Sequence, residues 1–241
     1  MKYNSEMTFL EHMLELRTRL LKIFFSIIFF SAIGYLNSNS IISFLLDPIN
    51  TPSVNLQVLK ITSIFSIKLL VAFFFGIIIS FPISIYHILS FIIPAINNKM
   101  TLARILSFIL LSSFLFIIGL LFGYYILIPF SVNFFKSISI PLIDSISLNY
   151  TLENYLIYLI WILIISSSIY QLPVFMIFFV RIGFLDINDL QANRRYVVVI
   201  FFILAAILTP PDPLSQLMIA LPLIFLYEIT LIIIRILNSK K

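Results

Sequence analysis

Charged residues are scarce in this chain: only 10% of its 241 residues are Asp, Glu, Lys or Arg, whereas 61% are hydrophobic. A soluble domain carries about 25% charged residues, and surface-to-volume scaling prevents a water-soluble fold of this length from burying so much apolar side chain. The composition therefore excludes a soluble globular protein and predicts that lipid is the solvent for most of the surface. The length suits one membrane domain over residues 1–241.

Cysteine is absent and glycine occurs only five times. Without cysteine the chain has neither structural disulfides nor thiolate metal sites. With so few glycines, we expect that packing of small residues four apart is not the main device joining the helices.

The common catalytic motifs are also missing. The sequence has no G-x-x-x-x-G-K-[ST] phosphate loop, no H-E-x-x-H zinc motif and no G-x-S-x-G elbow. The two histidines, His12 and His87, lie far apart in the sequence with no cluster of ligand-type residues beside them. These absences predict a protein that is not an enzyme and that has no metal site and no cofactor.

Long apolar runs are what the chain has instead, and a transmembrane helix needs about 20 such residues. Six spans are predicted, at about Leu20–Leu36, Ile64–Leu89, Ile105–Phe130, Leu156–Val180, Tyr196–Leu208 and Leu214–Ile234. The fifth is short: its roughly 13 residues extend about 20 Å, against a hydrocarbon core of about 30 Å. Three prolines between residues 209 and 214 separate it from the sixth.

Positively charged residues are concentrated on one predicted side of the membrane. Most of the 15 Lys and Arg residues fall on one predicted side, at Lys2, Arg17, Arg19, Lys22, Lys99, Arg104, Arg181, Arg194, Arg195, Arg235, Lys240 and Lys241. The opposite loops hold only Lys60 and Lys136. The positive-inside rule therefore predicts that both termini are cytoplasmic. Topology and anionic headgroups explain the net charge of +5 without a nucleic-acid partner.

The N-terminal segment is predicted to be retained, because Met1–Thr18 is rich in glutamate and no A-x-A-like cleavage pattern follows the first apolar run. Thr8 and Glu11 fit a capping box, so a helix is expected to begin there and continue into the first span. Glu15 lies four residues before Arg19, and the plainest interpretation of this pair is an exposed helix contact worth about 0.3–0.5 kcal/mol.

Polar residues inside the spans are costly and usually face protein or water. Lys68, Gln171 and Glu228 occupy such positions, and Asp212 stands in the proline turn. For Lys68 and Glu228 an internal charge pair or snorkelling remains an alternative to a functional role. Three prolines, Pro82, Pro173 and Pro222, are expected to kink their helices.

Four stretches, in order along the chain, resemble the TatC family. They are Phe9–Leu20, which is similar to its H-L-x-E-L-R-x-R-L opening; Phe91–Ile96, similar to F-x-x-P-A-L; Arg195–Val197 with Leu208–Gln216, similar to its last hairpin; and Phe225–Glu228. The resemblance covers essentially the whole chain. It implies an all-α protein of six kinked membrane helices in a cupped-hand arrangement.

The resemblance also implies a function: a receptor and core component of the twin-arginine translocase, which moves folded proteins using the proton-motive force. Implied partners are the twin-arginine signal peptide, single-span TatA- and TatB-type proteins, the lipid bilayer and further copies of the chain. Implied signal-binding residues are Glu15, Phe91, Glu11, Arg17, Asn97 and Asn98. Implied structural or partner-docking residues are Gln171, Pro210, Pro211, Asp212, Glu228 and Lys68.

Two positions depart from the family pattern. The loop from Asn97 to Arg104 lacks the second glutamate that usually completes the arginine site, and Gln171 stands where a glutamate is frequent. The second signal arginine then needs another partner: Glu11, Asp186, Asp189, the carbonyls of Asn97 and Asn98, or the ring of Phe91.

Other functions and several host membranes stay open at this point. A six-span secondary transporter predicts inverted repeats, and none is visible in the sequence; a membrane insertase or assembly factor is a third possibility. The Ile, Phe, Asn, Tyr and Lys bias is typical of an AT-rich genome and favours a plastid thylakoid over a bacterial or mitochondrial inner membrane.

Overall fold

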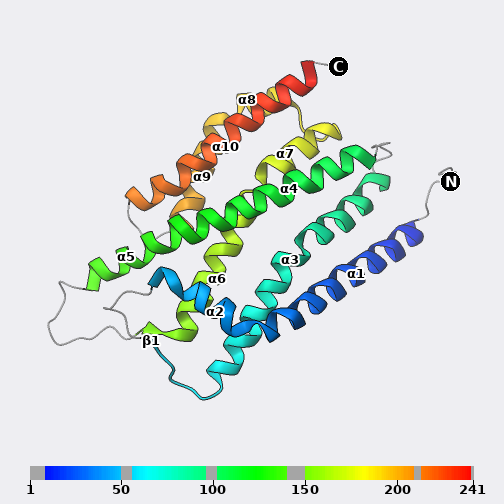
Figure 1. The fold of residues 1–241 in the computed structure, drawn as a ribbon. Helices are drawn as coiled ribbons and strands as arrows, with labels where there is room; N and C mark the ends of the chain where they lie inside the picture. The colour runs from blue at the N-terminus through cyan, green and yellow to red at the C-terminus, as the bar shows by residue number, and fades with distance from the viewer. Residues whose placement is uncertain (1–8, 50–55, 96–101, 140–149, 209–212, 240–241) are drawn as a thin grey trace. The chain divides into compact units, whose positions relative to one another are not determined.

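The computed structural model describes residues 9–49, 56–95, 102–139, 150–208 and 213–239, and these are almost entirely helical (Figure 1). The elements are α1 (Phe9–Leu36), α2 (Ser38–Leu46), η1 (Asp47–Ile49), β1 (Leu56–Gln57), α3 (Ser63–Ala95), α4 (Leu102–Phe122), η2 (Gly123–Leu127), α5 (Ile128–Ser139), β2 (Tyr150–Thr151), α6 (Leu152–Ile169), α7 (Leu172–Arg181), α8 (Ile187–Ala192), α9 (Arg194–Leu208) and α10 (Pro213–Ser239).

Internal contacts group these elements into two units. Unit 1 comprises Met1–Ile42 with Lys68–Ser113, and unit 2 comprises Ser43–Ile67 with Phe114–Lys241. The boundaries fall inside α2, α3 and α4. The first unit is thus built mainly from α1, α3 and the first half of α4, and the second from the helices that follow.

Five helical stretches in the described residues are long and apolar enough to cross a membrane. They are Leu10–Leu36, Ser63–Ile93, Ile105–Phe134, Leu152–Arg181 and Gln216–Ile236. Large apolar side chains stay exposed along them, Phe25 at 64% and Leu110 at 62% among others, as expected where lipid is the solvent. The protein is therefore an all-helical, multi-span membrane protein.

The short fifth predicted span corresponds to α9, which has 15 residues and is not among these five. At 1.5 Å per residue it extends about 22 Å, less than the hydrocarbon core.

In unit 1, α1 and α3 lie side by side and run in opposite directions (Figure 1). Glycines at two levels permit the contact. A Cβ atom on Gly34 would lie 3.0 Å from the carbonyl oxygen of Ala72, and one on Gly76 would lie 2.7 Å from that of Ile27. The close approach fixes the register, so residues near the start of α1 meet residues near the end of α3.

Unit 2 contains a second close helix contact, between the end of α4 and α6. Gly119 and Gly123 are four residues apart, and Cβ atoms on them would lie 2.7 Å from Ser167 Cα and 3.2 Å from Ser166 Cβ. The Ser166 hydroxyl also donates to the Gly119 carbonyl, at 2.7 Å. Few as they are, four of the five glycines, Gly34, Gly76, Gly119 and Gly123, thus lie at close helix contacts.

The three predicted kinks differ in outcome. The fourth span is interrupted at Tyr170 and Gln171, since α6 ends at Ile169 and α7 begins one residue before Pro173. Helices α3 and α10 instead continue through Pro82 and Pro222. The third span has a π-helical turn, η2, that ends two residues before Pro129.

Two connecting segments of unit 2 meet beside the helix ends. Strands β1 and β2 form a parallel pair, with Leu56 opposite Tyr150 and Gln57 opposite Thr151. Close by in sequence, the Ser63 hydroxyl donates to Glu153 Oε2 at 2.6 Å. The segments before α3 and α6 are thus joined.

Candidate functional site

Glu15 lies on the second turn of α1, and only one of its two carboxylate oxygens accepts hydrogen bonds from a described residue. Arg19, one turn later, donates from Nε and Nη2 to Oε1, at 2.9 and 2.6 Å. The two side chains are only 21% and 23% exposed. The predicted pair is therefore present but half-buried, and not the exposed contact that the sequence suggested.

Helix α3 contacts α1 one turn before Glu15. His12 of α1 stacks on Phe91 of α3 with ring centroids 4.2 Å apart and planes within 9°. Its Nδ1 lies 3.7 Å from Glu15 Oε2, which is beyond hydrogen-bond distance. One turn before Phe91, the Nδ1 atom of His87 is shielded from solvent and has no hydrogen-bond partner among the described residues.

Glu15 Oε2 is the unusual atom of this cluster. It is shielded from solvent, yet no donor in the described part of the chain makes a hydrogen bond to it. A buried acceptor left without a donor costs about 1–3 kcal/mol, and more when it is charged. The geometry therefore leaves one carboxylate oxygen that no described residue satisfies and that a further donor could reach.

The other predicted signal-binding residues have varied positions. Glu11 and Arg17 are exposed on α1, and Phe91 is half-buried under His12. Asn97 and Asn98 lie outside the described residues. Asp186, an alternative for the second arginine, caps α8 by accepting from the Asn188 amide at 3.2 Å.

Among the predicted partner-docking residues, Glu228 on α10 forms an ion pair with Arg194 of α9. The closest atoms are 3.5 Å apart, and the side chains are 39% and 48% exposed. Glu228 is thus ion-paired within unit 2 and still accessible. Lys68 is half-buried near the start of α3 and has no ion pair with a described residue. Pro210, Pro211 and Asp212 lie outside the described residues.

Gln171 is buried inside unit 2, where it is only 5% exposed. It lies between α6 and α7, and on the preceding residue the Tyr170 Cβ would lie 3.0 Å from a Cβ on Gly119 of α4. A buried position fits the structural role that the resemblance allows for Gln171.

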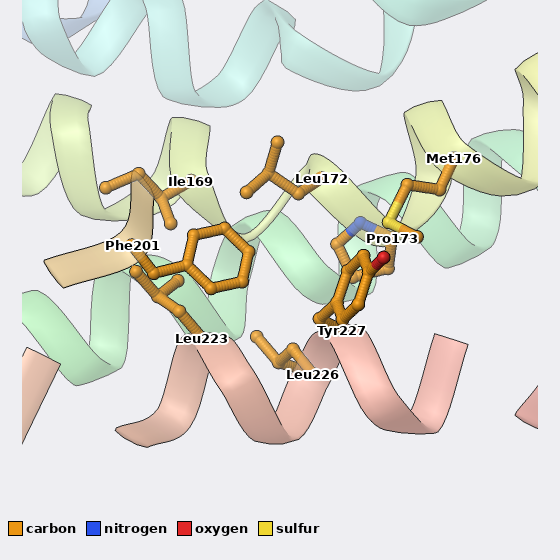
Figure 2. Close-up of a pocket in the computed structure, with 8 residues that line it drawn as sticks. All are labelled: Ile169, Leu172, Pro173, Met176, Phe201, Leu223, Leu226 and Tyr227. Carbon is orange, nitrogen blue, oxygen red and sulfur yellow. The ribbon is translucent and has the colours of Figure 1, made fainter. Parts of the chain in front are cut away.

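Beside Gln171 the interrupted fourth span packs on the last two helices. Figure 2 shows a small apolar pocket there, lined by Ile169, Leu172, Pro173, Met176, Phe201, Leu223, Leu226 and Tyr227. The Tyr227 ring meets Phe201 edge-on, with centroids 6.0 Å apart, and its hydroxyl donates to the Leu190 carbonyl at 2.7 Å. Tyr227 therefore ties α10 to both α8 and α9, next to Glu228.

The contacts of His12 and of the pair Gly119 and Gly123 were not predicted from the sequence. His12 and Phe91 are far apart in sequence, and only the antiparallel register of α1 and α3 brings them together. A signal was available, because the stacked pair comes from the two stretches that resemble family motifs. No described group of three or more His, Cys, Asp or Glu residues could hold a metal ion.

Comparisons with known proteins agree with the arrangement. Residues 11–222 match the family TatC, described as Sec-independent protein translocase protein. The TatC protein of Listeria innocua is 32% identical over 222 residues, which cover 92% of this chain and 89% of that one. The TatC protein of Desulforapulum autotrophicum is 37% identical over 98 residues, and these span only 36% of that protein.

A solved structure is also similar. The crystal structure of the twin-arginine translocase receptor TatC in the detergent DDM superimposes with a TM-score of 0.79 at 26% identity, covering 92% of this chain and 99% of that one.

Proposed function

This chain belongs to the TatC family of Sec-independent protein translocase proteins, and we propose that Glu15 of α1 is the carboxylate that binds an arginine of the twin-arginine signal. The chain functions in protein transport by the Tat pathway, as the TatC component and twin-arginine receptor of the translocase. It is a transport protein and not an enzyme, and it is integral to the membrane with several spans.

The unsatisfied Glu15 Oε2 is the observation that carries this proposal. A guanidinium is a planar fork that can donate to a carboxylate through two N–H groups, and such charge-assisted bonds are among the strongest in proteins. An incoming arginine would satisfy Oε2 while Arg19 keeps Oε1. A lysine ammonium offers no such fork.

Glu11 is our choice for the second signal arginine. It lies one turn before Glu15 on the same helix, so the two carboxylates are neighbours about 6 Å apart at Cβ. The ring of Phe91 would stack on a signal arginine, and Arg17 would lie at the exposed edge of the site. Asn97 and Asn98 would supply carbonyl acceptors in place of the missing second glutamate.

Binding of a labelled twin-arginine signal peptide to the purified chain tests the role of Glu15. A charge-assisted contact contributes about 1.5–3 kcal/mol, so Glu15→Gln should weaken binding roughly 10- to 100-fold, with Glu15→Asp between. Asp47→Asn, in an exposed segment far along the chain, is the matched control and should bind normally.

The alternative is that Glu15 interacts only with Arg19 and takes no part in peptide binding. Glu15→Gln would then cost about 0.3–0.5 kcal/mol of stability and leave peptide affinity unchanged. Wild-type affinity in Glu15→Gln, with the twin-arginine peptide still preferred over a twin-lysine peptide, would assign recognition to another residue.

The membrane topology is a second part of the proposal: a single domain of six spans, with α9 as the short fifth, both termini cytoplasmic, and the cupped-hand arrangement that the resemblance implies. The native chain has no cysteine, so single cysteines can be labelled from each side. Cysteine at Asn188 should react from the cytoplasmic side and cysteine at Gln57 from the opposite side. Labelling of both from the same side would contradict six spans.

Partners and the host membrane complete the proposal. We propose that single-span TatA- and TatB-type proteins dock beside Glu228, with Lys68, Pro210, Pro211 and Asp212 in supporting roles, and that the chain self-associates. Crosslinkers at Glu228 should capture a single-span protein, and capture of lipid alone would refute the docking site. The composition favours a plastid thylakoid, although the relatives named above are bacterial.

A further inference from the structure

We propose that His12 competes with the signal arginine for its binding site. In the free protein His12 stacks on Phe91 and lies beside Glu15 Oε2, and the twin-arginine peptide displaces it. The inference rests on the proposed role of Glu15 and adds a residue that regulates access to it.

The two contacts of His12 are the ones that a guanidinium would make. Both groups are flat, and the imidazole already lies parallel to the Phe91 ring at 4.2 Å and 9°. Both present ring or fork nitrogens toward the carboxylate, and Nδ1 of His12 lies 3.7 Å from Glu15 Oε2. An arginine bound to Glu15 and stacked on Phe91 would need the space that His12 fills.

His12 can be displaced because it makes no hydrogen bond to Glu15. At 3.7 Å the imidazole covers Oε2 without making a hydrogen bond, and Oε2 remains unsatisfied. A guanidinium donor at hydrogen-bond distance would relieve the buried oxygen. The side chain of His12 is 25% exposed, so it has room to rotate outward.

Displacement adds a requirement to recognition. A ligand has to replace a stacking contact as well as a charge, and a guanidinium stacks flat on an aromatic ring whereas an ammonium does not. His12 therefore lowers the affinity for every signal peptide while making arginine the better competitor for the site.

Equilibrium binding of a fluorescent twin-arginine signal peptide to the full-length chain in lipid nanodiscs tests the inference. His12→Ala removes the competitor, and we expect roughly 2- to 10-fold tighter binding, the equivalent of one aromatic contact. His12→Arg places a permanent guanidinium three residues before Glu15, and we expect weaker binding. Met13→Ala, an exposed neighbour on α1, is the matched control and should leave affinity unchanged.

The outcomes separate the two proposals. Equal or weaker binding by His12→Ala, with Glu15→Gln still weakening binding roughly 10- to 100-fold, would overturn the role of His12 and leave that of Glu15 intact. Normal binding by Glu15→Gln would overturn both. Tighter binding by His12→Ala that is lost again in the double variant with Glu15→Gln is the result we expect. The weakening by His12→Arg provides a second test in case His12→Ala disturbs folding.

Discussion

Gly119→Ala is predicted to destabilise unit 2, although the same change in an unpacked helix would stabilise it. Alanine is favoured over glycine in a helix interior by about 0.8–1.0 kcal/mol. Here the new Cβ would lie 2.7 Å from Ser167 Cα and 3.0 Å from the Ser166 carbonyl oxygen, both backbone atoms that cannot rotate away. Overpacking of this kind costs about 1–3 kcal/mol, and separating α4 from α6 would also stretch the 2.7 Å bond from Ser166 to Gly119.

The measurement is reversible unfolding of the purified protein in mixed micelles with increasing SDS. Gly123→Ala is the graded comparison, because its nearest neighbours are side-chain atoms at 3.0 and 3.2 Å that can move. We therefore expect Gly119→Ala to lose more stability than Gly123→Ala. A Gly119→Ala protein as stable as the wild type, or more stable, would refute the close contact.

Two further predictions concern the last helices and use the same unfolding assay. Glu228→Gln should lower stability by less than about 1 kcal/mol, because its ion pair with Arg194 is long, at 3.5 Å, and half-exposed; a larger loss would indicate a pair more buried than the structure has it. Tyr227→Phe should cost about 0.5–1.5 kcal/mol through the lost bond to Leu190, which is 2.7 Å long, and an unchanged stability would show that this bond does not hold α8 against α10.

The long helices could be predicted from sequence because membrane insertion depends on composition. The predicted first span, Leu20–Leu36, is the apolar part of α1 (Phe9–Leu36), and Ile64–Leu89 lies within α3 (Ser63–Ala95). The true helices are longer because a helix continues past the lipid boundary wherever its backbone hydrogen bonds can be kept. Composition indicates the apolar part and not the helix end.

The interruption of the fourth span was predicted and the π-helical turn was not, although each lies beside a proline. Pro173 lacks an N–H group, and a helix can accommodate it in its first turn, which is where α7 places it. The turn at Gly123–Leu127 ends two residues before Pro129, which lacks the N–H group that would bond to the Tyr125 carbonyl in a regular α-helix. Gly123 in the same turn also packs on α6, and a contact between distant segments has no local sequence signal.

Only part of the candidate site could be predicted from the sequence. Glu15 and Phe91 were identified from motifs, which indicate single positions but not the contacts between them. The stack of His12 on Phe91 depends on the register between α1 and α3, and that register is fixed further along by Gly34 and Gly76. Contacts between distant segments follow from packing, and their register has no local sequence signal.

The link between Ser63 and Glu153 provides the last prediction, because it joins two segments that the sequence gives no reason to connect. The Ser63 hydroxyl donates to the carboxylate at 2.6 Å, a charge-assisted bond worth about 1.5–3 kcal/mol. Glu153 also lies in the first turn of α6, where a negative charge is favoured by the helix dipole by about 0.3–1 kcal/mol.

These two contributions can be separated by a double-mutant cycle measured by unfolding. Ser63→Ala removes the bond alone, whereas Glu153→Ala removes the bond and the dipole interaction, so Glu153→Ala should be the more destabilising change. In the double variant the bond is lost only once, and the two losses should fall short of additivity by about the energy of the bond. Ser168→Ala, which removes a hydroxyl bonded within its own helix to Ile164, is the control for losing a serine. Full additivity of Ser63→Ala and Glu153→Ala would mean that the two side chains do not interact in the folded protein, and that the segments before α3 and α6 are held together by the β1–β2 pair instead.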